Sequence, residues 1–312
     1  MRIYFAIAMI MAALASTAHT RADEKTVPFS INAAGYIVVP LEISGEEASC
    51  FILDTAARRF GITNEMADLP GAERVYRGMI NHVSSGGNLR LPHARLHNLR
   101  FAGHELELGN SAIFPSRVAN GPVSCGVLGF DAYHGYVMRL NGPARRLELD
   151  PHSGDLARAG WRLISAEPNN QGALMIQTSY RGQELTVILA TGLSRSMLDY
   201  SAAELLFPER FEGKPKPSLK GHGATIASLG FLASEREYKT LLLPDFAIKS
   251  WHVGNVEAAV TRLPARVQTG HVKAPLLMLG ADVLAHKDFA LDTRSHQLWV
   301  PPAAGMQPDA GE

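Results

Sequence analysis

The chain contains one short segment twice, first as FILDTAA at residues 51–57 and again as VILATGL at residues 187–193. In each copy an apolar run of strand-forming residues enters a turn of small residues. The first copy places the carboxylate of Asp54 at the turn, and the second places the methyl group of Ala190 at the same position. This single difference governs what chemistry the chain can perform.

The repetition extends well beyond the two turns. The stretch GYIVVPLEI and the glycine two residues later, residues 35–45, have the same glycine spacing as residues 172–182. Residues 127–149 then match residues 278–300 without a gap, beginning with VLGFD and MLGAD. Self-similarity at a fixed spacing indicates tandem copies of one unit, and the many short strand-like runs between glycines indicate a mostly β unit. We therefore expect a pseudo-two-fold axis, with the two turns facing each other across it.

Composition and the N-terminus indicate an exported globular protein. Apolar residues make up 46% of the chain and charged residues 19%, which is sufficient for a packed core. The formal net charge is zero, so there is no electrostatic case for binding nucleic acid or an anionic membrane. Arg2, the apolar run of residues 3–14 and the small residues 15–18 follow the order of a secretory signal peptide. That apolar run is shorter than the ~20 residues of a spanning helix, so we predict a periplasmic or secreted protein with no membrane attachment after cleavage.

The same patterns divide the chain into segments. We predict a signal peptide over 1–22, an N-terminal unit over 27–150, a connection over 151–171, a C-terminal unit over 172–301 and a disordered tail over 302–312. A short helix is expected to start within residues 62–67, with Thr63 or Asn64 as its cap, and another is expected over 197–206. A β-hairpin is expected around residues 78–87, and residues 221–230 occupy the equivalent place in the second unit.

These residues resemble a known family. Residues 51–57 resemble the active-site turn of aspartic peptidases, apolar-apolar-Asp-Thr-Gly-Ala, and residues 187–194 resemble that turn with its Asp replaced. Residues 127–129 and 278–280 resemble the apolar-apolar-Gly strand that packs behind the turn. The resemblance to tandem retropepsin-like domains covers residues 27–301. It implies a pepsin-like acid-protease fold, two retropepsin-like β-barrel lobes with a cleft between them, and an extended peptide or protein as the partner.

The family's chemistry needs two carboxylates close together, because the pair shares one proton and then acts as base and acid. The resemblance assigns the catalytic position to Asp54, and it places Ala190 where the second acid is missing. It assigns the surrounding turn positions to Thr55, Ala56 and Arg58 in the first copy, and to Thr191, Gly192 and Ser194 in the second.

Two further departures affect the first turn. Ala56 replaces the family's glycine, and its Cβ would crowd a tight turn. Arg58 replaces the hydroxyl residue that bonds the carboxylate, and in reach of Asp54 it would hold that side chain as an ion-paired anion. A lone exposed Asp54 would stay ionised near a pKa of ~3.9.

We therefore expect an exported aspartic-peptidase-like protein whose proteolysis is lost or weak and whose cleft accepts extended peptide. One alternative is a working endopeptidase that uses Asp54 with a substitute partner, or with Asp54 of a second chain. Another is a structural or assembly module with the cleft closed. No cofactor and no metal is expected, and the sequence leaves the oligomeric state open.

The two cysteines, Cys50 and Cys125, would meet an oxidising compartment. If their strands are neighbours, a disulfide could join them and stabilise the fold by up to ~4 kcal/mol. The alternative is two buried thiols that pack as small apolar groups. The sequence does not decide between them, because it does not give the Cα separation.

Several other polar residues carry simpler expectations. Asp292 and Thr293 spell the first letters of the active-site turn but lie where a strand ends, so we interpret them as a turn. Asp131 and Asp282, after the two Gly strands, are expected to cap the segments that follow them. The histidines at 93, 97 and 104, the last followed by Glu105, are expected at the surface, because residues four apart in a strand do not converge on a metal.

Overall fold

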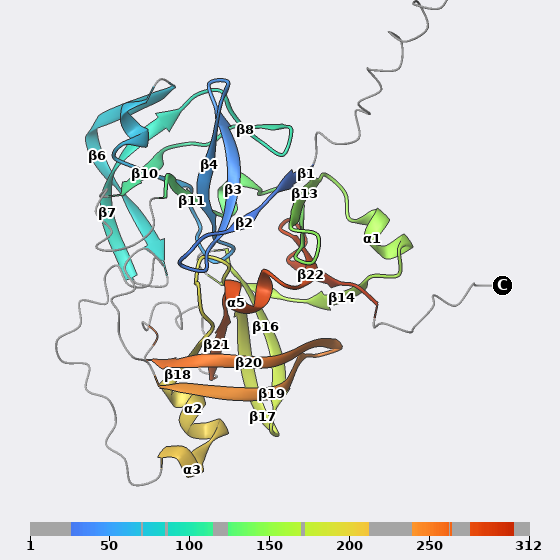
Figure 1. Cartoon of the computed structure of the whole chain (residues 1–312). Helices are drawn as coiled ribbons and strands as arrows, with labels where there is room; N and C mark the ends of the chain where they lie inside the picture. Colours follow the sequence, from blue (N-terminus) through green and yellow to red (C-terminus); the bar gives the residue numbers. More distant parts are fainter. Residues whose placement is uncertain are drawn as a thin grey trace, which may run out of the picture.

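The structure is a computed structural model that describes residues 26–69, 71–84, 87–114, 124–169, 172–211, 239–261, 263 and 275–302. It is mostly β, with its strands arranged in several sheets (Figure 1). The predicted signal peptide, the predicted element at 221–230 and all of the predicted tail except Pro302 lie outside the described residues.

The N-terminal part of the chain forms a ten-stranded sheet in the order β6-β7-β10-β5-β11-β4-β3-β8-β9, with β2 beside β3. Its strands are β2 (Ser30–Ile31), β3 (Ile37–Ile43), β4 (Glu46–Leu53), β5 (Gly61–Thr63), β6 (Ala72–Ser84), β7 (Gly87–Leu96), β8 (Leu99–Phe101), β9 (His104–Leu106), β10 (Ser111–Phe114) and β11 (Gly126–Leu128). The predicted hairpin is confirmed, because β6 and β7 pair antiparallel up to Ser84 opposite Gly87.

The C-terminal part forms a seven-stranded sheet in the order β15-β16-β17-β21-β18-β20-β19. Its strands are β15 (Glu167–Pro168), β16 (Leu174–Tyr180), β17 (Gln183–Leu189), β18 (Met197–Asp199), β19 (Thr240–Ile248), β20 (Trp251–Thr261) and β21 (Leu276–Leu279). The short helices α2 (Tyr200–Leu206), α3 (Pro208–Phe211) and α5 (Ala281–Leu284) accompany this sheet.

The two sheets share one local arrangement around the repeated turns. Strand β4 enters the first turn and runs parallel to β11, with Leu53 opposite Leu128. Strand β17 enters the second turn and runs parallel to β21, with Leu189 opposite Leu279. In each case the strand after the turn, β5 or β18, pairs antiparallel with the Gly strand. The repeated sequence therefore builds the same strand pairs twice.

A third, six-stranded sheet takes strands from both halves of the sequence, in the order β1-β13-β12-β22-β23-β14. These strands are β1 (Thr26–Pro28), β13 (Arg146–Asp150), β12 (Val137–Asn141), β22 (Asp288–Asp292), β23 (Gln297–Val300) and β14 (Arg162–Ser165). The two middle strands, β12 and β22, pair antiparallel with Arg139 opposite Ala290. They are also the strands that the sequence repeat aligns, so this shared sheet joins equivalent elements of the two halves.

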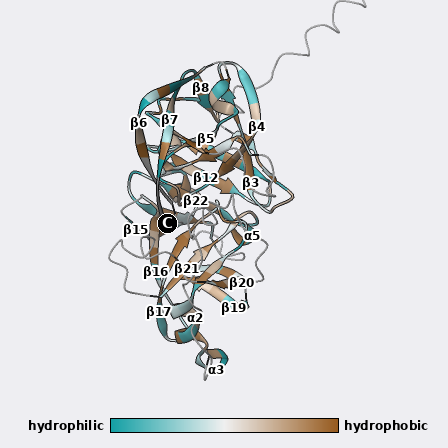
Figure 2. Cartoon of the chain, turned by 90° about the vertical axis from the view of Figure 1, so that its left-hand side faces the viewer, coloured by the Kyte–Doolittle hydropathy of each residue, from teal (hydrophilic) through white to brown (hydrophobic). Residues whose placement is uncertain are grey.

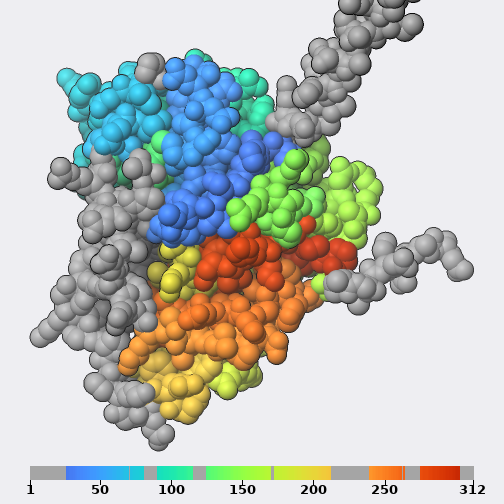
Figure 3. All heavy atoms as spheres, in the orientation of Figure 1, coloured from blue at the N-terminus to red at the C-terminus, as the bar shows by residue number. Residues whose placement is uncertain are grey.

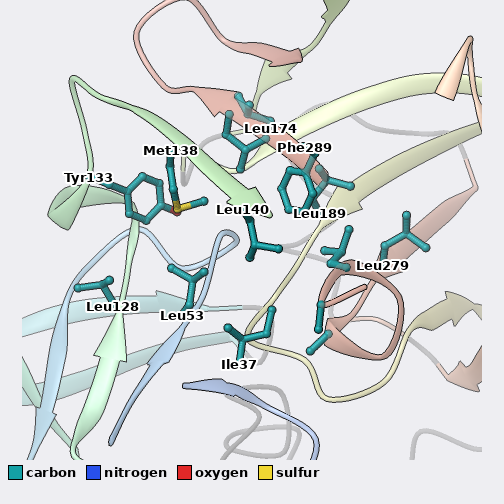
Figure 4. Close-up of a cluster of buried hydrophobic side chains, with 14 of the residues drawn as sticks. Ile37, Leu53, Leu128, Tyr133, Met138, Leu140, Leu174, Leu189, Leu279 and Phe289 are labelled. Atoms are coloured by element: carbon teal, nitrogen blue, oxygen red, sulfur yellow. The ribbon is translucent and has the colours of Figure 1, made fainter. Parts of the chain in front are cut away.

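The shared sheet lies against a continuous apolar core. Buried side chains from β4, β11 and β12 pack in one cluster with those from β17, β21 and β22 (Figure 4). Figure 2 shows hydrophobic residues concentrated on the strands that meet in the middle, and in Figure 3 the last strands (red) lie between the N-terminal strands (blue) and β19–β20 (orange). Separating the halves would expose this cluster to water, so the core fixes how the two repeated turns meet.

Three local expectations need correction. Residues 197–199 form β18 rather than the start of a helix, because Leu198 pairs with Leu277; α2 starts only at Tyr200, where the Asp199 carboxylate accepts from the Ser201 N–H at 3.1 Å. Residues 62–63 belong to β5, and the short 3-10 helix η1 (Met66–Asp68) follows Glu65 without a side-chain cap. The segment predicted as a connection contains α1 (Gly154–Arg158) as well as β14 and β15.

Candidate active site

The two repeated turns meet through a reciprocal set of hydrogen bonds. The Thr55 N–H donates to Oγ1 of Thr191 at 3.0 Å, and the Thr191 N–H donates to Oγ1 of Thr55 at 3.1 Å. Each hydroxyl then donates across to the opposite strand, Thr55 to the Leu189 carbonyl at 2.6 Å and Thr191 to the Leu53 carbonyl at 2.8 Å. Both threonines are buried, so these bonds satisfy polar groups that have no access to water.

The strand behind each turn explains the apolar-apolar-Gly motif. The Asp54 N–H donates to the Leu128 carbonyl at 3.0 Å, and the Ala190 N–H donates to the Leu279 carbonyl at 2.8 Å. A Cβ at Gly129 would lie 2.6 Å from the Arg59 carbonyl oxygen, and a Cβ at Gly280 would lie 2.6 Å from the Arg195 carbonyl carbon. Glycine is needed because backbone passes directly over both positions.

Asp54 lies against the opposite turn. Its Oδ1 accepts from the Ala56 N–H at 2.8 Å. A Cβ on Gly192 would be only 2.2 Å from the carboxyl carbon of Asp54, so the carboxyl group fills the space that a side chain at position 192 would need. Partial burial raises the pKa of Asp54, although the N–H groups of Ala56, Ala57 and Gly192 act in the opposite direction. The expectation of a lone exposed carboxylate with an ordinary pKa is therefore wrong.

Ala190 occupies the position equivalent to Asp54 in the second turn. The residue is 1% exposed and belongs to an apolar cluster from the C-terminal half, here called the Ala190 cluster. Its members are Ala173, Met175, Ile188, Ala190, Leu193, Leu263, Leu276 and Met278. The methyl of Ala56 packs against this cluster from the other half. Ala56 does not have a positive φ, so its backbone conformation is one that alanine adopts readily.

The two remaining turn positions, Arg58 and Ser194, do not bond Asp54. Arg58 is exposed, and the described residues contain no ion pair between it and Asp54. The expected charge pairing is therefore not made. Ser194 instead hydrogen-bonds Tyr36. Burial raises the pKa of Tyr36, although the hydrogen bond with Ser194 acts in the opposite direction. The fifth residue of each turn therefore does not support the Asp54 carboxyl: Arg58 is exposed and Ser194 bonds Tyr36.

Tyr36 is a site residue that the sequence reasoning missed. It follows a turn in which the Asn32 side chain accepts from the N–H groups of Ala34 and Tyr36, at 3.1 and 3.0 Å. The same turn recurs at Asn169, whose side chain accepts from the Ala173 N–H at 3.0 Å. The repeated Asn-x-x-Gly spacing was a signal for this element, with tyrosine after the first copy and alanine after the second.

Asp131 and Asp282 hold the chain after each turn. Asp131 accepts from the Phe60 N–H at 2.6 Å, whereas Asp282 accepts from the N–H and the hydroxyl of Ser196 at 3.0 and 2.8 Å. Asp282 also accepts from its neighbour Val283 at 3.1 Å. Neither aspartate caps the segment that follows it, because the 3-10 helix η2 (Phe130–Ala132) follows Gly129 and α5 follows Gly280, both without a side-chain cap, so the capping expectation is wrong. Phe60 supplies no hydroxyl to the Asp131 carboxylate. Burial raises the pKa of Asp131 to about 6, although the hydrogen bond from the Phe60 N–H acts to lower it. Both residues therefore hold in place the segment that follows each turn.

The other polar residues singled out from the sequence lie away from the turns. Asp292 accepts from the N–H groups of Arg294 and Ser295, which confirms the strand-end turn. His97 is exposed, but His93 is 6% exposed in β7 beside Ala112, so the prediction that it lies at the surface is wrong. Within the part of the chain that is described, no group of His, Cys, Asp or Glu side chains could hold a metal ion.

The two cysteines are joined. Cys50 and Cys125 form a disulfide between β4 and the residue before β11, with their Cα atoms 5.2 Å apart. The Cys125 N–H also donates to the Cys50 carbonyl at 2.9 Å, which continues the β4–β11 pairing. The bridge therefore links the two strands that position Asp54.

Among the described residues no helix has the length and apolar character needed to cross a bilayer. A scan against known protein-family models finds no match for this chain, and a search of curated proteins finds no relative. The function of this chain is therefore inferred from the residues and geometry of the two turns.

Proposed function

We propose that this chain is an exported, two-lobed aspartic-peptidase-like protein that binds extended peptide between its lobes and has lost, or nearly lost, proteolytic activity. The observation that carries the proposal is Ala190. It stands at the position equivalent to Asp54, is buried among apolar side chains, and has no group that exchanges a proton.

The chemical reason is the division of labour in a carboxyl pair. One carboxylate takes a proton from the attacking water while the other carboxyl donates a proton to the peptide carbonyl. Asp54 can take one of these roles, but the methyl group of Ala190 can take neither. A methyl group also cannot hold the water between two oxygens. The expected loss of rate is therefore that of removing one member of a pair that acts as a unit.

The reciprocal threonine bonds and the shared sheet support the hypothesis that the chain forms two related lobes. Thr55 and Thr191 bond to each other and to the opposite strands in matching ways, and β12 pairs with its own repeat equivalent β22. An arrangement of two related halves places a ligand groove at their junction by default. The long hairpin of β6 and β7 offers backbone groups that could pair with an extended ligand.

The test combines cleavage with binding, using the chain without residues 1–22 and with its disulfide intact. A denatured protein substrate is incubated from acidic to neutral pH with wild type and with Asp54→Asn. We expect no cleavage above the buffer control for either. Robust, pepstatin-sensitive cleavage that Asp54→Asn abolishes would overturn the loss of activity and favour a working endopeptidase.

Binding is measured with a fluorescent decapeptide and with pepstatin, a peptide-like inhibitor, as competitor. We expect saturable decapeptide binding that pepstatin displaces in wild type, because both molecules would occupy one groove in an extended conformation. Failure of both probes to bind would overturn the peptide-binding part of the proposal and favour the structural or assembly module.

A further inference from the structure

We propose that Ala56 is the residue that excludes a second carboxylate from position 190, so that the alanines at 56 and 190 are one coupled change. The inference rests on the proposed function in one respect only: position 190 is taken as the place of the second catalytic aspartate of an aspartic peptidase. The packing of the two alanines does not depend on whether the protein has any activity.

The first step is the contact between Asp54 and Gly192. A Cβ at position 192 would lie 2.2 Å from Cγ, 2.3 Å from Oδ2 and 2.6 Å from Cβ of Asp54. Real Cβ atoms do not make contacts this short, so one of the two groups would have to move. The Asp54 carboxyl is held by the Ala56 N–H at 2.8 Å and cannot swing away without losing that bond. An aspartate at the first position of one turn therefore requires glycine at the third position of the other.

The second step is that the relation holds in both directions. The bonds of Thr55 and Thr191 match in length, 3.0 against 3.1 Å for the N–H donors and 2.6 against 2.8 Å for the hydroxyl donors. Exchange of the two turns therefore maps position 54 onto 190 and position 192 onto 56. Residue 56 should therefore lie against residue 190 in the same way that Gly192 lies against Asp54.

The third step is where the Ala56 methyl lies. It packs against the Ala190 cluster, whose members all come from the C-terminal half. This methyl therefore packs against apolar side chains of the opposite half, and from the equivalence of the two turns we infer that it lies against Ala190, as a Cβ on Gly192 would lie against Asp54. By the same equivalence, the two alanine methyl groups would occupy the space that corresponds to the Asp54 carboxyl and Gly192 on the other side of the junction. Because protein interiors are close-packed, an aspartate introduced at position 190 would bring its carboxyl carbon against the Cβ of Ala56.

The coupling predicts that no single substitution rebuilds the pair. Ala190→Asp alone should force the new side chain out of its place or push the turns apart. Ala56→Gly alone should remove a methyl and leave a small gap. Only both together should reproduce the packing of Asp54 against Gly192.

The first experiment is a double-variant cycle of Ala190→Asp and Ala56→Gly, followed by thermal unfolding at acidic pH, where the introduced carboxyl is uncharged. We expect Ala190→Asp alone to lower the unfolding midpoint sharply, and addition of Ala56→Gly to restore more than half of that loss. Additive effects of the two substitutions would overturn the proposal.

The second experiment repeats the cycle on the opposite side, with Gly192→Ala and Asp54→Ala, and introduces no acid. We expect Gly192→Ala to fold poorly or to unfold at a much lower temperature. Adding Asp54→Ala should recover part of the difference, because it removes the carboxyl atoms at 2.2 and 2.3 Å but keeps the Cβ at 2.6 Å. A Gly192→Ala variant as stable as wild type would overturn the steric relation, even where the first cycle gives no folded protein.

Cleavage assays on the same variants separate this inference from the proposed function. In one outcome the stability effects are coupled but no variant cleaves substrate in acid, even after Arg58→Ser is added to the Ala190→Asp and Ala56→Gly pair. This outcome supports the packing relation and counts against the peptide groove. Cleavage by Ala190→Asp alone would overturn the exclusion by Ala56 while supporting the peptidase-like site.

Discussion

Thr55 and Thr191 donate their backbone N–H groups to each other's hydroxyl oxygen, at 3.0 and 3.1 Å, and thereby fasten the two turns together. Thr191→Val keeps the shape of the side chain but removes the acceptor for the Thr55 N–H and the donor to the Leu53 carbonyl. Leaving two buried groups without partners should lower the free energy of unfolding by about 2–5 kcal/mol. Urea denaturation of the two proteins measures the difference.

Thr191→Ser is the matched control, because it retains the hydroxyl and loses only a methyl group. It should cost less than Thr191→Val, with the remaining loss coming from packing. Equal losses for the two variants would mean that the hydroxyl contributes nothing and that the turns are held by apolar packing alone.

The sequence predicted this pair of turns because Thr55 and Thr191 hold the same position in the repeated segments 51–57 and 187–193, although the second copy has one residue fewer between its preceding glycine and the turn. Two copies of one turn are enough to predict a symmetric junction. The contact between Tyr36 and Ser194 was out of reach, because it depends on how the halves pack rather than on local spacing. The reason for Gly192 was hidden in the same way, since its requirement comes from the carboxyl of Asp54 and not from its own backbone angles.

The local errors have a common physical cause, which is pairing with strands distant in sequence. Residues 197–199 have the composition of a helix start, yet Met197 and Leu198 complete the ladder between β21 and β20. His93 was expected at the surface, but β10 brings Ala112 beside it and buries it. Propensity was overridden in each case by tertiary contacts, which a single sequence does not display.

The unequal support of the two aspartates behind the turns gives a pH-dependent prediction. The folded-state pKa of Asp131 is about 6, above its ordinary value of 3.8, because burial disfavours the charged form. Its contribution to stability is therefore fully present below pH about 3.8 and is lost as the pH rises through about 6. Asp131→Asn stays neutral and can still accept from Phe60, so it should be more stable than wild type at neutral pH and similar to it in acid. Denaturation midpoints at several pH values measure the difference.

Asp292→Asn is the control with the opposite sign. Burial alone would raise the pKa of Asp292, but hydrogen bonds from Ser295, Arg294 and Ser153 outweigh it and lower the pKa. The charged form is therefore stabilising above the ordinary pKa, and that contribution is lost as the pH falls. Asp292→Asn should be less stable than wild type at neutral pH. A neutral-pH gain from this substitution, or a loss from Asp131→Asn, would contradict the assignment.

The disulfide gives a prediction about the unfolded chain. Cys50 and Cys125 are 75 residues apart in sequence, and closing a loop of that length restricts the unfolded ensemble. Cys50→Ser with Cys125→Ser should lower the free energy of unfolding by up to about 4 kcal/mol, since β4 and β11 remain paired in the folded state without the bridge. Denaturation of wild type with and without reductant provides the comparison. The Ser variants should be insensitive to reductant, and a wild type that is equally insensitive would show that the bridge does not form.

The junction of the shared sheet contains a partly buried ion pair between the halves. Arg139 on β12 donates Nε and Nη2 to the two oxygens of Asp288 on β22, at 3.2 and 2.9 Å, and its guanidinium lies 4.9 Å from the centroid of the Trp161 ring. Lysine cannot make the forked bond or the planar stack, so Arg139→Lys should cost about 1–2 kcal/mol.

A double-variant cycle with Arg139→Met and Asp288→Asn should give a coupling energy of about 1 kcal/mol, at the upper end for exposed pairs, because both side chains are mostly shielded from solvent. The exposed pair of Arg158 and Asp155 on α1 is the control, since its side chains are 79% and 74% exposed. Arg158→Lys should therefore be nearly neutral in urea denaturation. If the two pairs give the same small energies, the junction between β12 and β22 is held by its backbone ladder and its core, and the forked ion pair adds nothing to it.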